Sequence, residues 1–115
     1  MKTADVIIVG SGASGLFNAL FLPQDYKVIV ITKKEVEESD SFLAQGGISA
    51  LKNPEDYDSY FEDTMKAGHY ENDKGAVEKM IKESPQIIQD LKDFGVRFDL
   101  KDGEIEFTSC LLYTL

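Results

Sequence analysis

The chain carries near its start the sequence Asp5-Val6-Ile7-Ile8-Val9-Gly10-Ser11-Gly12-Ala13-Ser14-Gly15, in which an apolar run leads into glycines spaced G-x-G-x-x-G. The apolar run predicts a buried β-strand, and the segment from Ala13 to Leu22, which Pro23 ends, predicts a helix. A second apolar run, Val28-Ile29-Val30-Ile31, predicts another strand. The order strand, glycine loop, helix, strand is that of a βαβ unit, so we expect an α/β fold.

The three glycines of this loop have separate expected roles. Gly10 allows a tight turn, Gly12 lets the backbone approach a diphosphate, and Gly15 lets the helix pack closely on the strand. The first N–H groups of the helix, and the positive end of its dipole, would then face the phosphates. The alternative is a glycine-rich turn without a ligand, as in any α/β protein. The βαβ order favours dinucleotide binding.

A signal peptide is a competing interpretation, because the stretch from Val6 to Phe21 has no charged residue. However, Asp5 stands where a basic residue is expected, glycines would weaken a membrane helix, and a strand follows in place of a cleavage site. The single cysteine, Cys110, cannot form an internal disulfide. We therefore expect a cytoplasmic protein.

Size and charge limit the possible functions. With 115 residues, of which 43% are hydrophobic, the chain can form one small core but is short for a complete enzyme built on a dinucleotide-binding fold. Its net charge is -9, from 21 acidic and 12 basic residues. This charge repels polyphosphate backbones and anionic membranes, so we expect no nucleic-acid and no membrane partner. The acidic residues match no metal-ligand spacing, and no metal site is expected.

The segment after the second strand contains a further glycine signal. A loop from Lys33 to about Ser41 leads into an apolar stretch, residues 42–50, that the pair Gly46-Gly47 interrupts. Paired glycines lower both helix and strand propensity. They indicate either backbone placed against a flat ring or a phosphate, or an ordinary buried turn.

Helices are expected in the second half. Asn53 as N-cap and Pro54 at the first helical position predict a helix that ends at Ala67. Another helix is expected to open at Asn72, and the pair Ser84-Pro85 is expected to restart the pattern. The apolar residues that repeat along these helices are expected in the core: Val77, Met80, Ile81, Ile88, Leu91 and Phe94.

A β-hairpin is expected from Val96 to Phe107, with Asp102-Gly103 as its two-residue turn. Counting outward from the turn pairs three sets of residues across the strands: Lys101 with Glu104, Leu100 with Ile105, and Phe98 with Phe107.

Taken together, four segments resemble the N-terminal part of the L-aspartate oxidase family: Gly10–Gly15, Ile31-Thr32-Lys33, Asp40–Ile48 and Glu62–Gly68. Their order and spacing match from about Asp5 to Thr108. The family is a branch of the flavoproteins that include succinate dehydrogenase and fumarate reductase. The resemblance implies that residues 1–108 are the incomplete N-terminal part of a Rossmann-like FAD-binding domain. It also implies oxidation of L-aspartate to iminoaspartate, a role in NAD biosynthesis through quinolinate, and a partnership with quinolinate synthase.

The resemblance also implies three groups of contacts to FAD. The pyrophosphate would be held by the glycine loop, Gly10, Ser11, Gly12, Ala13, Ser14 and Gly15. Lys33 would lie by the adenosine end. The flavin side would be approached by Asp40, Ser41, Phe42, Leu43, Ala44, Gln45, Gly46 and Gly47.

The chain departs from related patterns at three places. The second strand ends in Thr32-Lys33, where a ribose-binding acid is usual. Asp40 replaces the histidine that covalent flavoproteins of this branch carry, so FAD would be non-covalent. Residues 109–115 form an atypical tail where Arg-Glu-Gly would follow Thr108, and no catalytic residue is expected within the chain. Two alternatives stay open: a fragment of a fumarate reductase-type subunit, and a stand-alone dinucleotide-binding module.

Overall fold

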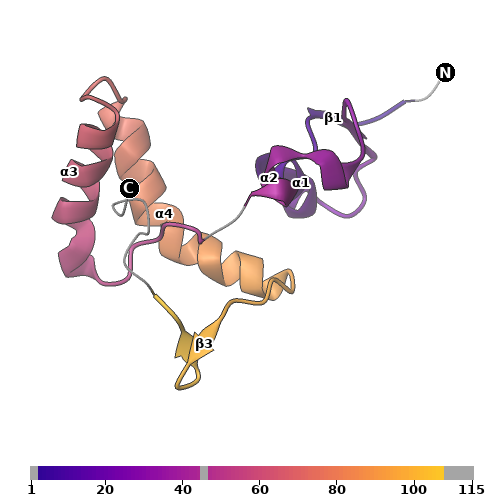
Figure 1. Ribbon diagram of the computed structural model, residues 1–115. Helices are drawn as coiled ribbons and strands as arrows, with labels where there is room; N and C mark the ends of the chain where they lie inside the picture. Colours follow the sequence, from indigo (N-terminus) through magenta and orange to yellow (C-terminus); the bar gives the residue numbers. More distant parts are fainter. Residues whose placement is uncertain (1–2, 45–46, 108–115) are drawn as a thin grey trace. The chain divides into compact units, whose positions relative to one another are not determined.

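The computed structural model describes residues 3–44 and 47–107. They form two compact units, one up to Gly47 and one from Ile48 onward. In Figure 1 the first unit runs from indigo to magenta and the second from magenta to yellow.

The first unit is the expected βαβ unit. It consists of β1 (Val6–Val9), α1 (Ala13–Phe21) and β2 (Val28–Ile31). The two strands pair in parallel, with Val6 opposite Val28 and Val9 opposite Ile31. Helix α1 contacts both strands. The predicted strands, helix and connectivity are therefore confirmed.

The two faces of this small sheet differ in burial. Ile8 points toward α1, since its Cγ2 would lie 3.3 Å from a Cβ added at Gly15. The alternate residues Ile7 and Val9 are 60% and 82% exposed. Parallel sheets are normally covered on both faces. The face that carries Ile7 and Val9 is thus an apolar surface without cover among the described residues.

The predicted loop from Lys33 to Ser41 is more ordered than expected. It contains a 3₁₀ turn, η1 (Val36–Glu38), and leads into a short helix, α2 (Asp40–Leu43). The Ser39 hydroxyl accepts the Phe42 N–H at 3.3 Å and caps α2. The prediction missed these elements because one-turn helices have too little apolar periodicity to be seen in sequence.

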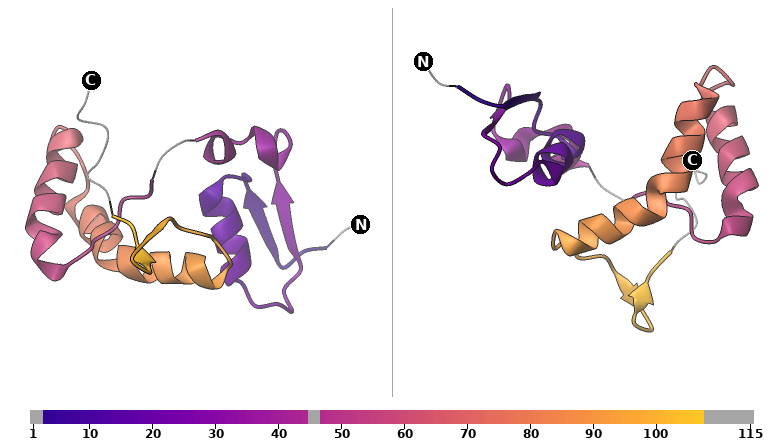
Figure 2. Two further views of the ribbon diagram at one scale, coloured as in Figure 1. Left: turned by 60° about the horizontal axis from the view of Figure 1, so that its bottom comes forward. Right: turned by 180° about the vertical axis from the view of Figure 1, so that it is seen from behind.

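The second unit is a helical hairpin with a small β-hairpin. It comprises η2 (Pro54–Asp56), α3 (Tyr57–Ala67), α4 (Lys74–Asp93), β3 (Leu100–Lys101) and β4 (Glu104–Ile105). Helices α3 and α4 lie side by side in both views of Figure 2. Asn53 precedes η2, as predicted, and the Asp56 carboxylate accepts its N–H at 3.1 Å.

The core of this unit lies between the two helices. Met65, Val77 and Ile81 are buried there, and Leu51, Tyr57, Tyr60 and Phe61 pack against them. Ile88 is also buried, as predicted. The prediction was wrong for Met80 and Phe94, which are 48% and 41% exposed. Met80 lies about 100° around α4 from Ile81, and Phe94 follows the last helical residue.

The start of α4 also differs from the prediction. Its N-cap is Asp73 and not Asn72, because the Asp73 carboxylate accepts the Ala76 N–H at 2.8 Å. The Asn72 side chain instead packs over the end of α3, where any Cβ on Gly68 would collide with it.

The predicted restart at Ser84-Pro85 is wrong, because α4 is one continuous helix with Pro85 inside it. Proline removes the N–H that would bond to the carbonyl of Ile81. The Ser84 hydroxyl donates to that carbonyl at 2.7 Å and thus supplies the missing donor. The same hydroxyl accepts the Leu51 N–H at 2.8 Å, which ties the preceding segment to the helix.

The predicted hairpin register is confirmed near the turn. Leu100 pairs with Ile105, and Lys101 with Glu104. Both turn residues, Asp102 and Gly103, have positive φ, as a two-residue type I′ turn requires. The expected pair of Phe98 and Phe107 lies beyond the β-ladder.

Candidate cofactor-binding site

The glycine loop connects β1 to α1 through a backbone shape that few residues could adopt. Gly10 has φ +112°, and its N–H donates to the Ile31 carbonyl at 2.8 Å. A Cβ on Gly15 would collide with the Gly10 carbonyl oxygen. The turn and the close contact of helix and strand both depend on the absence of side chains.

The N-terminus of α1 has no cap from its own segment. Gly12 is the N-cap residue and has no side chain, and no acidic residue lies in the first turn. The Ala13 N–H donates instead to the Ser41 hydroxyl at 2.9 Å, from α2. A Cβ on Gly12 would lie 3.1 Å from that same hydroxyl oxygen. The start of α1 and the segment at Ser41 therefore lie together, although 28 residues separate them.

A second link joins the glycine loop to the end of β2. The Ser11 hydroxyl lies 2.8 Å from the Thr32 hydroxyl, and Ser11 is only 5% exposed. Thr32 in turn donates to the Lys34 carbonyl at 2.9 Å. The loop, the β2 end and α2 thus form one connected group of segments.

The structure brings together many of the residues expected at the site. The glycine loop, the 32–34 segment and Ser41 are linked by hydrogen bonds. The side chains of Phe42 and Leu43 are 63% and 65% exposed. Gln45 and Gly46 lie outside the described residues. Nothing lies within 4 Å of a Cβ added at Gly47.

Thr32 is a contact that the sequence pattern did not predict, because there it is only a departure from the usual acidic residue. The available signal was its position, since Ser11 and Thr32 each follow shortly after a strand end and Val9 pairs with Ile31. Parallel strands that end in register place their following residues close together.

The geometry of the loop fits a diphosphate. The first N–H groups of a helix lack intrahelical partners and carry a partial positive charge. At α1 the Ala13 N–H already donates to the Ser41 hydroxyl, so an anion would approach the other N–H groups of the first turn, beside Gly12 and Gly15, which have no Cβ. Lys33 follows β2 and adds a positive charge in sequence next to Thr32.

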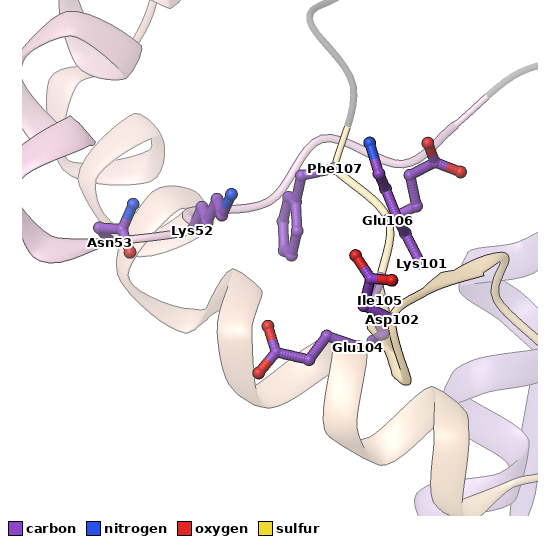
Figure 3. Close-up of a pocket in the computed structure, with 8 residues that line it drawn as sticks. All are labelled: Lys52, Asn53, Lys101, Asp102, Glu104, Ile105, Glu106 and Phe107. Carbon is purple, nitrogen blue, oxygen red and sulfur yellow. The ribbon is translucent and has the colours of Figure 1, made fainter.

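The second unit contains a polar pocket of about 530 Å³ between the segment at Lys52 and the β3–β4 hairpin. Figure 3 shows the Phe107 ring beside the Lys52 side chain, whose Nζ lies 5.4 Å from the ring centroid. Three carboxylates and two lysines are among its lining residues: Lys52, Asn53, Lys101, Asp102, Glu104, Ile105, Glu106 and Phe107. Nothing in this lining is suited to a diphosphate, because the carboxylates outnumber the lysines.

The pKa shifts also lie in the second unit. A hydrogen bond of 2.5 Å to the Glu62 carboxylate raises the pKa of the Tyr70 hydroxyl above its usual value. A hydrogen bond to Glu78 raises the pKa of the Lys82 ammonium. Both groups are exposed: Tyr70 follows the end of α3 and bonds back to that helix, and Lys82 pairs with Glu78 one turn away on α4. These shifts therefore mark surface contacts and not a catalytic centre.

Within residues 3–44 and 47–107, no helix is long and apolar enough to cross a membrane. In the same residues, no three His, Cys, Asp or Glu side chains are grouped so that they could hold a metal ion.

A parallel βαβ unit whose glycine loop opens onto a helix N-terminus defines a dinucleotide-binding unit. Residues 5–110 match the sequence pattern of the FAD binding domain family. The chain therefore belongs to this family, and its cofactor is FAD.

Curated relatives include several proteins named L-aspartate oxidase. The one from Clostridium perfringens (strain 13 / Type A) is 43% identical over 107 residues, which cover 93% of this chain and 24% of that protein. The L-aspartate oxidase of Clostridium acetobutylicum is 43% identical over 105 residues, which cover 90% of this chain and 24% of that protein. The L-aspartate oxidase of Synechocystis sp. is 46% identical over 105 residues, which cover 90% of this chain and 19% of that protein. The chain thus spans about a quarter or less of the length of these relatives.

Proposed function

We propose that this chain is the N-terminal, cofactor-binding segment of an FAD-dependent L-aspartate oxidase. The identity of 43% to 46% with proteins of that name, over at least 90% of the chain, carries the proposal. The glycine loop at the start of α1 supports it, because that loop has the shape a diphosphate requires.

The reaction would be the oxidation of L-aspartate to iminoaspartate. The flavin supplies the redox step by accepting the electrons, while protein groups orient the substrate and the ring. The product would enter NAD biosynthesis through quinolinate, with quinolinate synthase as the partner that consumes it. We place the protein in the cytoplasm, because its one cysteine gives no sign of an oxidising compartment.

The proposed role of this segment is to bind the cofactor. Backbone groups of residues 10–15 would hold the pyrophosphate, Lys33 would lie by the adenosine end, and residues 40–47 would line the flavin side. We assign no catalytic role to any residue of the chain. The exposed apolar face at Ile7 and Val9 supports an incomplete domain, since further strands or helices of the whole protein would cover it.

Residues 1–108 would form the partial FAD-binding domain. Residues 109–115 would be a tail that departs from the family pattern. Their structure lies outside the described residues, and the proposal rests on Ser109-Cys110-Leu111 standing where Arg-Glu-Gly is expected.

The test is anaerobic reduction of FAD bound to a polypeptide that contains this segment. We expect L-aspartate, and not succinate, to bleach the flavin absorbance. The 115-residue chain alone is expected to give no more reduction than free FAD, because the groups that position the substrate are missing from it. Reduction by succinate, or by L-aspartate in the chain alone, would contradict the assignment.

The mode of flavin attachment is a second test on the same preparation. Asp40 cannot form a histidyl link, so acid precipitation should release all the flavin to the supernatant. A protein pellet that keeps its flavin absorbance would contradict a non-covalent site.

A further inference from the structure

We propose that Thr32, the residue that follows β2, is a positioning residue that fixes the glycine loop in the shape that binds the FAD diphosphate. The inference rests on the proposed FAD site and assigns a role to a residue outside the expected contact set. It is carried by the two hydrogen bonds of the Thr32 hydroxyl, one to Ser11 and one to Lys34.

The protons of these hydroxyls have one consistent arrangement. A threonine hydroxyl has a single proton, and Thr32 donates it to the Lys34 carbonyl at 2.9 Å. The Ser11 hydroxyl, 2.8 Å away, must then donate its own proton to Thr32. The result is a directed chain from the glycine loop, through the strand end, to the backbone after Lys33.

This arrangement limits what Ser11 can do for a ligand. Its hydroxyl proton is already used within the protein, and the side chain is 5% exposed. Without a proton to donate, the Ser11 hydroxyl presents only lone pairs, and these would repel a phosphate oxygen. Ser11 therefore serves the diphosphate through its backbone, and its side chain anchors the loop.

The same arrangement explains why Thr32 can stand where an acid is usual. In the common pattern the carboxylate at this strand end binds the ribose of the dinucleotide. Here the hydroxyl of Thr32 is turned to Ser11 and to Lys34. The strand end thus holds two loops together, one expected at the pyrophosphate and one carrying Lys33.

The experiment compares isosteric and conservative variants at this position. Thr32→Val keeps the branched shape of the side chain but removes its hydrogen bonds to Ser11 and Lys34. Thr32→Ser keeps the hydroxyl group. Ser11→Ala removes the partner, and the double variant completes a cycle. Thr64→Val is the matched control, because among the described residues the Thr64 hydroxyl bonds to the Tyr60 carbonyl alone, inside α3.

Two readouts separate the inference from the proposed function. The first is the FAD dissociation constant of a polypeptide that contains the segment, measured by quenching of flavin fluorescence. We expect about a fivefold loss of FAD affinity for Ser11→Ala, which removes one hydrogen bond, and at least that loss for Thr32→Val, which removes two. The double variant should lose no more affinity than Thr32→Val alone, because that variant already removes both bonds. Thr32→Ser and Thr64→Val should bind FAD like the parent.

The second readout needs no flavin. It is hydrogen exchange of the backbone amides of residues 11–15 in the 115-residue chain, which should be faster in Thr32→Val than in the parent and in Thr32→Ser. A parent that does not bind FAD would contradict the proposed function, while the exchange data would still decide the role of Thr32. Unchanged exchange in Thr32→Val, or losses of affinity that multiply in the double variant, would overturn the inference.

Discussion

Gly12 and Gly15 show how two glycines of one loop can be required for different reasons. A Cβ on Gly15 would meet backbone, the Gly10 carbonyl, which cannot move without reshaping the turn. A Cβ on Gly12 would meet the end of a side chain, the Ser41 hydroxyl, at 3.1 Å. Gly15 is therefore needed for the fold of the loop, whereas Gly12 leaves room for the Ser41 hydroxyl beside the helix N-terminus.

Gly15→Ala should destabilise the first unit by about 1 to 3 kcal/mol, because the added methyl group forces helix and strand apart. The measurement is hydrogen exchange of the β1 and α1 amides. Gly47→Ala is the control, since no atom lies within 4 Å of its added Cβ. Equal stability of Gly15→Ala and the parent would show that the close packing described here is wrong.

Ser84 explains how α4 continues through Pro85. The hydroxyl bonds to the Ile81 carbonyl that proline leaves without a donor, and it also holds the Leu51 N–H. Ser84 is 8% exposed, so water cannot readily replace these bonds. One side chain thus keeps the helix continuous and attaches the preceding segment to it.

Ser84→Ala should lower the free energy of unfolding by about 1 to 3 kcal/mol, because a buried donor and a buried acceptor lose their partner. Denaturant unfolding followed by circular dichroism measures this. Ser59→Ala is the matched control, since its exposed hydroxyl bonds only to the Asp56 carbonyl, and its effect should stay within about 0.5 kcal/mol. If both variants lose a similar free energy of unfolding, the two buried hydrogen bonds of Ser84 do not contribute more than an exposed one.

Adding Pro85→Ala to Ser84→Ala should restore part of the lost stability. Alanine at position 85 supplies the N–H that the Ile81 carbonyl needs. The Leu51 N–H would still lack its acceptor, so recovery should be incomplete. If the double variant recovers no stability, the loss in Ser84→Ala does not come from an Ile81 carbonyl without a donor.

The elements that sequence predicted best were those with a strong local signal. Continuous apolar runs predicted β1 and β2, the glycine loop and Pro23 marked the two ends of α1, and Asp102-Gly103 predicted the hairpin register. The Ser84-Pro85 pair was read as a helix break, because proline alone favours a break and the compensating bond depends on a serine rotamer. The helix propensities of the residues around Pro85 therefore could not predict the bond from Ser84 to the Ile81 carbonyl.

For the chain as a whole, the sequence predicted the βαβ unit, the family and the cofactor. It identified the glycine loop and the 40–47 segment as parts of one site from a resemblance. It could not give the links between them, from Ala13 to Ser41 and from Ser11 to Thr32, because these join residues 28 and 21 positions apart. Such contacts depend on the register of β1 and β2 and on the position of α2.

We propose that the loop at the start of α1 binds the FAD diphosphate. The most direct test is an FAD titration that compares Gly12→Val with its parent in a polypeptide that contains this segment. A branched side chain there would push against Ser41 and fill the approach to the backbone, so affinity should fall at least about tenfold, or about 1.4 kcal/mol. Unchanged affinity in a folded Gly12→Val variant would contradict this claim.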